Sequence, residues 1–138
     1  MKKYDLIREG NLFRIRALKD FGSIVKGELG GLVEGEHNLS QKGDCWISYN
    51  AKVYGKAQVH GNAKVFGIAQ LFENAQVYGN AQIYGYAKVF GNAQVFGCAK
   101  VSGNAQVYST AYVSGNALVS GDALVFGNAL VLNTGFFN

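Results

Sequence analysis

Hydrophobic and polar positions follow a six-residue unit that repeats without interruption over residues 47–130. In the unit Val-Tyr-Gly-Asn-Ala-Gln at 77–82, an aliphatic residue stands first and alanine stands fifth, and all fourteen units keep these two positions. Side chains alternate across a strand, so each alanine and the aliphatic residue two places later share one face. The pattern predicts a series of short strands that point Val and Ala to the same side.

The third and fourth positions of the unit predict a tight corner. They are mostly Gly-Asn, a pair that accepts the positive φ of such corners, and the chain has no proline that would remove a ladder donor. A four-residue strand and a two-residue corner at fixed period predict a solenoid whose coils stack on one another.

The pattern aliphatic-x-x-x-small-x resembles the hexapeptide-repeat family, whose fold is a left-handed parallel β-helix of triangular cross-section. The resemblance implies an all-β, single-stranded β-helix of about six turns with three units per turn. Extending the frame backwards predicts further inward positions at Leu29, Val33, Leu39 and Cys45. The expected core is a column of Val and Ala that is too narrow for a ligand.

Residues 1–28 lie outside the repeat. Segments 4–7 and 12–18 are typical of two short strands around Arg8-Glu9-Gly10-Asn11. A hairpin here would cover the first coil, which otherwise exposes an unpaired edge. The expected organisation is therefore an N-terminal cap at 1–28 and a parallel β-helix at 29–136, in one structural domain.

A second resemblance rests on residues 16–21, Gly30-Gly31 and residues 40–47, with Gly-Asp-Cys-Trp at 43–46 as its clearest element. These segments are similar to the N-terminal part of a group of uncharacterised β-helix proteins encoded by bacteria and phages, some labelled as transferases. The resemblance implies a phage-associated protein, for which we expect a host-directed role such as inhibition of a bacterial defence complex.

The second position of most units is aromatic. Sorting these residues by the eighteen-residue turn places five rings on one face, which we call the long ladder: Tyr54, Phe72, Phe90, Tyr108 and Phe126. Stacking contributes roughly 0.5–1.5 kcal/mol per pair, so the long ladder is explained by stabilisation of a thin fold. Tyr and Phe are also favoured in interface cores, so a protein-binding role stays open.

One corner departs from the Gly-Asn pattern. Ile68 and Tyr86 replace the usual asparagine one turn apart, and Phe66 and Tyr84 stand beside them. Four apolar side chains at a corner are not required for stacking. We expect this corner patch (Phe66, Ile68, Tyr84 and Tyr86) to bind a protein partner.

The sixth position changes character towards the end of the repeat. It is Lys or Gln from Lys52 to Gln106, and apolar residues follow at Tyr112, Leu118, Leu124, Leu130 and, beyond the repeat, Leu132. A contiguous group of outward apolar residues predicts an interface, here of a homo-oligomer (dimer or trimer) joined through the C-terminal end. The alternative is that the last residues fold back over these side chains.

The resemblance to the hexapeptide-repeat family also implies acyl transfer as a candidate activity. Enzymes of that family use a histidine base in a cleft between subunits, with an acyl-coenzyme A along the coils. This chain has His37 in the irregular first turn and His60 on a regular unit, and no insertion beside either forms a pocket. We therefore expect no catalytic residue and no cofactor, and acyl transfer through His60 stays an alternative.

Composition narrows the remaining classes. Two Cys and two His are scattered, so no metal site is expected. The net charge is +4, and the basic residues of 1–28 are mixed with acids, which disfavours nucleic-acid binding. No long apolar run or signal sequence indicates a membrane segment, and Cys45 and Cys98 lie too far apart for a disulfide, so we expect a cytoplasmic protein. The preferred interpretation is a non-catalytic protein-binding scaffold, with a self-assembling structural element as the alternative.

Overall fold

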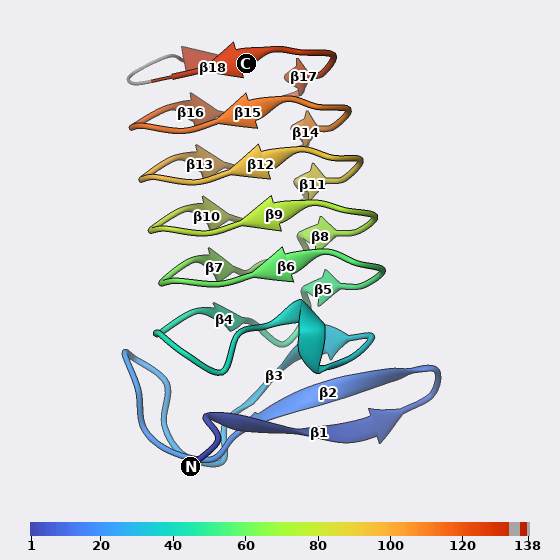
Figure 1. Cartoon of the computed structure of the whole chain (residues 1–138), viewed down its shortest axis with the longest axis vertical. Coiled ribbons are helices and arrows are strands. Elements are labelled where there is room, and N and C mark those ends of the chain that lie inside the picture. The colour runs from blue at the N-terminus through green and yellow to red at the C-terminus, as the bar shows by residue number, and fades with distance from the viewer. Residues whose placement is uncertain (133–135, 138) are drawn as a thin grey trace.

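The computed structural model describes residues 1–132 and the backbone of 136–137. It is an all-β solenoid of about six turns that stands on an antiparallel hairpin (Figure 1). The chain climbs from the N-terminal hairpin through successive coils, and each coil adds one strand to each side of the stack (Figure 1). The predicted fold class is confirmed.

The strands form three sheets. The first sheet holds β1 (Tyr4–Glu9), β2 (Leu12–Ala17), β3 (Leu29–Val33), β5 (Lys52–Val53), β8 (Gln70–Leu71), β11 (Lys88–Val89), β14 (Gln106–Val107) and β17 (Leu124–Val125). The second sheet holds β4 (Trp46–Ile47), β7 (Lys64–Val65), β10 (Gln82–Ile83), β13 (Lys100–Val101), β16 (Leu118–Val119) and β19 (Phe136–Phe137). The third sheet holds β6 (Gln58–Val59), β9 (Gln76–Val77), β12 (Gln94–Val95), β15 (Tyr112–Val113) and β18 (Leu130–Val131).

Strands of adjacent coils pair in parallel with a register of eighteen residues, as Val77 with Val95. The first and fifth positions of the repeat form the buried core, where Val95 and Ala93 are completely covered. Each strand spans two residues, shorter than the predicted four, because the Ala81 N–H already donates to the carbonyl of Tyr78 and turns the chain there. The Tyr78 N–H still donates to the Val95 carbonyl at 3.0 Å, so the ladder continues beyond the strand.

The corners of the repeat have a positive φ at the third position of the unit, and Tyr49 is the exception. Gly85 has φ +67, and Glu73 and Ser109, which replace the usual glycine, adopt φ 56 and 59. A Cβ at Gly85 would lie 2.9 Å from the backbone nitrogen of Gly103 in the next coil. Glycine is therefore favoured twice at these corners, by the left-handed backbone and by the close approach of stacked coils.

The hairpin at the N-terminus is confirmed, with β1 two residues longer than predicted. Strand β3 pairs antiparallel with β2 on one side and parallel with β5 on the other, so it joins the hairpin to the solenoid. The inward placement of Leu29 is wrong, because its residue is 43% exposed. The pairs Arg14–Leu32 and Arg16–Leu29 leave an extra residue in β3, and this bulge reverses the face on which Leu29 lies.

The Gly-Asp-Cys-Trp element is where the hairpin meets the first coil. The buried Lys3 ammonium donates to the carbonyls of Cys45 at 2.8 Å and Gly43 at 3.2 Å. The Tyr4 hydroxyl donates to the carbonyl of Leu39 in the first coil, which also contains the 3-10 helix η1 (Glu36–Asn38). These bonds cover the carbonyl edge of the first coil, which supports the capping role proposed for the hairpin.

Candidate functional site

The five rings of the long ladder stack on one another. Phe90 lies 4.8 Å from Phe72 and 4.9 Å from Tyr108, centroid to centroid, with ring planes within 4° of parallel. Tyr54 and Phe126 continue the stack at its two ends, at 5.3 and 5.4 Å. The assignment of these five residues to one face, made by counting eighteen residues per turn, is confirmed. Each ring stacks on its neighbours along the coil axis.

The corner patch combines one stacked pair with two exposed side chains. Phe66 and Tyr84 stack at 4.8 Å on the second sheet's face. Ile68 is 47% exposed and Tyr86 is 61% exposed on the adjoining corner. The structure thus brings the four predicted residues together, and Ile68 and Tyr86 present apolar surface to solvent.

Tyr49 extends the corner patch towards the hairpin. It was not identified from the sequence as part of this surface. It lies in the same corner one turn before Gly67, it is exposed, and the Arg14 guanidinium carbon lies 3.7 Å from its ring centroid. Arg14 is held by Glu9 at 2.6 Å and donates to the Tyr49 carbonyl at 2.9 Å. The only signal in the sequence was an aromatic residue at a corner position that is usually glycine.

The apolar residues near the C-terminal end are exposed. Leu124 is 55% exposed and Leu130 is 64% exposed, and three further side chains of this group are exposed as well: Tyr112, Leu118 and Leu132. They lie on all three sides of the last coils, in β15, β16, β17 and β18 and just beyond β18. In the part of the chain that the structure describes, nothing folds back over them.

The two histidines line one shallow hollow of about 470 Å³. No inserted loop forms this hollow; it arises because the irregular first turn brings η1 beside β6. The His37 Nε2 atom lies 2.8 Å from the Gly55 carbonyl, and His60 stacks on Tyr78 at 4.8 Å. Burial lowers the pKa of His60. Among the described residues, no side chain hydrogen-bonds His60 to orient it as a base.

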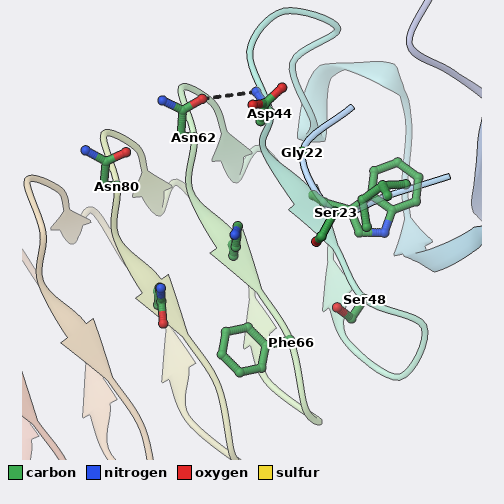
Figure 2. Close-up of a pocket in the computed structure, with 11 residues that line it drawn as sticks. Gly22, Ser23, Asp44, Ser48, Asn62, Phe66 and Asn80 are labelled. Carbon is green, nitrogen blue, oxygen red and sulfur yellow. Dashed lines mark hydrogen bonds between the residues drawn. The ribbon is translucent and has the colours of Figure 1, made fainter. Parts of the chain in front are cut away.

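A second cavity lies between the loop that joins β2 to β3 and the face of the second sheet, and we call it the cap pocket. It has a volume of about 490 Å³. One wall is residues 22–24 of the loop between β2 and β3, and the sheet side includes Trp46, Lys64 and Gln82. Asp44, Asn62 and Asn80 lie in a row on successive corners, with Ser48 and Phe66 on the opposite side (Figure 2).

The cap pocket is held by hydrogen bonds within its own walls. The Asn62 side-chain oxygen accepts from the Asp44 N–H at 3.1 Å (Figure 2). In the loop, Phe21 and Ile24 exchange backbone hydrogen bonds at 3.0 and 2.8 Å, and Phe21 packs edge-on against Trp46. Sequence reasoning missed the pocket, because the repeat places the rows of side chains but nothing in it places the loop.

Comparison with models of known protein families gives no match, and comparison with curated proteins gives none either. Within the described residues, no group of three His, Cys, Asp or Glu side chains is placed to hold a metal ion. None of the described helices has the length and apolar character needed to cross a membrane.

Proposed function

We propose that this chain is a non-catalytic scaffold that binds a partner protein through the corner patch. The observation that carries the proposal is the exposure of Ile68 and Tyr86 beside the stacked Phe66–Tyr84 pair. The rings of the long ladder stack on one another and so stabilise the coils. The Ile68 and Tyr86 side chains are exposed and are not needed to build a coil. Exposed aromatic and aliphatic anchors on a rigid surface are typical of interface cores.

The rigidity of the fold supports this role. Every coil is hydrogen-bonded to the next with an eighteen-residue register, so the patch is presented in one arrangement before a partner arrives. The nearby Tyr49, backed by the Arg14 guanidinium, adds a further aromatic contact. We propose a partner with a complementary apolar surface, and the phage-linked resemblance at 43–46 favours a bacterial host protein as that partner.

A pull-down from bacterial lysate tests the proposal. The double variant Ile68→Asn and Tyr86→Asn restores the asparagine of neighbouring units, so it keeps the fold and should lose the partner. Phe126→Ser is the matched control, because it removes an exposed ring far from the patch and places there the serine found at Ser102 and Ser120. Retention of the partner by the double variant would contradict the proposal, and loss by Phe126→Ser alone would point to the long ladder instead.

We further propose that the chain forms a homo-oligomer through the exposed leucines of the last coils. Leu118, Leu124 and Leu130 replace the Lys and Gln of earlier coils at the same position of the repeat. This change concentrates exposed apolar area at one end of the molecule, as an interface requires. The proposal is independent of the corner patch, which lies on earlier coils.

A further inference from the structure

The cap pocket has the size and the lining of a small-ligand site. Its volume of about 490 Å³ falls in the range of known ligand pockets, roughly 300–1,000 Å³. Its walls are the loop at 22–24 and the first coils, so segments distant in the sequence enclose it. Phe21 and Ile24 exchange hydrogen bonds within the loop, and the Phe21 ring packs against Trp46, which holds the loop beside β4.

The polar groups of the cap pocket are left available for a ligand. Within the described part of the chain, the side chains of Lys64, Asn80 and Gln82 form no hydrogen bond with another residue. Amides and hydroxyls both donate and accept hydrogen bonds, and adjacent coils repeat them at about 4.8 Å. The lining therefore matches a ligand with several hydroxyl groups along its length.

The charges of the cap pocket select a neutral ligand. Lys64 and Asp44 contribute one charge of each sign. Phosphate groups are usually held by several cations or by free backbone N–H groups. Here the backbone N–H groups of the sheet are already hydrogen-bonded. The Lys64 backbone N–H donates to the Ala81 carbonyl at 3.0 Å, and the Gln82 backbone N–H donates to the Ala99 carbonyl at 3.0 Å. Strands β7 and β10 are each paired on both sides, so neither offers an edge to an added peptide strand.

Two aromatic residues complete the lining. Phe66 is partly buried on the sheet side of the cap pocket, and its ring stacks on Tyr84 of the corner patch. Trp46 is 4% exposed and lines the same space. Apolar rings beside amides and hydroxyls suit a ligand that has both a C–H face and a hydroxyl edge.

From these contacts we propose that the cap pocket binds a neutral saccharide, with Asn80 and Gln82 as hydrogen-bonding residues and Phe66 beneath the sugar ring. This goes beyond the protein-binding role of the corner patch. Because Phe66 belongs to both surfaces, the test uses residues that belong only to the cap pocket.

Trp46 provides a direct readout, since it is the single tryptophan of the chain and lines the cap pocket. The full chain is titrated with four neutral disaccharides: N,N′-diacetylchitobiose, cellobiose, lactose and maltose. We expect at least one to give a saturable change in Trp46 fluorescence and saturation transfer to its ring protons. Removing two hydrogen bonds with Asn80→Ala and Gln82→Ala should weaken that sugar at least about tenfold.

Asn74→Ala and Gln76→Ala form the matched control, because they change the same Asn-Ala-Gln sequence away from the cap pocket and should leave the affinity unchanged. The variant Ile68→Asn and Tyr86→Asn should also bind the sugar, which separates this proposal from the partner-binding one. Absence of a response to all four disaccharides, equal affinity in the Asn80/Gln82 variant, or a response to inorganic phosphate alone would overturn the proposal.

Discussion

Phe72 and Phe90, eighteen residues apart in the chain, stack with ring centroids 4.8 Å apart and planes only 4° from parallel. This spacing equals the separation of hydrogen-bonded strands, so the backbone ladder and the ring stack reinforce each other. The side chains outside the core thus contribute to holding the coils together, and their removal should have measurable effects.

Phe90→Ala should lower the free energy of unfolding by about 1–3 kcal/mol, because Phe90 stacks on both Phe72 and Tyr108. Phe126→Ala should cost about half as much, because Phe126 stacks on Tyr108 alone and is itself exposed. Chemical denaturation of both variants measures the difference. Equal losses would contradict the prediction that a second stacked neighbour adds stability.

Gly85→Ala should destabilise the protein more than Gly127→Ala. Both glycines have a positive φ, which costs an alanine about 1 kcal/mol or more. Only at Gly85 would the added Cβ meet the next coil, 2.9 Å from the Gly103 nitrogen, which adds roughly 1–3 kcal/mol. Thermal and denaturant unfolding of the pair checks this, and similar values would mean that coil contact is unimportant at the corners.

Stability should fall as the pH rises above 10 because of Tyr4. Burial raises the pKa of the Tyr4 hydroxyl above its ordinary value of 10.0. Above that pH the unfolded chain releases this proton while the folded chain keeps it, so alkali favours unfolding. The contribution is complete below pH 10 and is lost as the pH approaches the raised pKa of the folded state.

Tyr4→Phe isolates this effect. The variant should be about 1 kcal/mol less stable at neutral pH, because the Leu39 carbonyl loses its donor. Its stability should fall less steeply than that of the wild type above pH 10. Burial raises the pKa of Cys45 and lowers that of Lys3, but both groups are present in the two proteins. Parallel pH profiles for the two proteins would therefore exclude the Tyr4 contribution.

The exposed leucines should drive concentration-dependent association. Leu118→Gln and Leu124→Gln restore the polar residue of earlier coils and should shift sedimentation towards the monomer. Gln58→Leu and Gln76→Leu, which add leucines on other coils, serve as a control for general apolar area. A wild-type protein that stays monomeric at high concentration would rule out the interface.

Sequence alone was sufficient for the solenoid and for the order of the side chains on it. The reason is that the six-residue period is local: it places like residues beside one another in adjacent coils, as Val77 lies between Val59 and Val95. The long ladder and the corner patch follow from counting eighteen residues per turn, which the register of Val77 with Val95 confirms.

Only the tertiary structure decided what lies where the period breaks. The bulge that turns Leu29 outwards, the hollow shared by His37 and His60, and the cap pocket all depend on how residues 1–46 pack against the first coils. The hydrogen bonds from Lys3 to Cys45 and from Tyr4 to Leu39 span 42 and 35 residues. No repeating pattern encodes such contacts, because each is made once, between segments that lie far apart in the sequence.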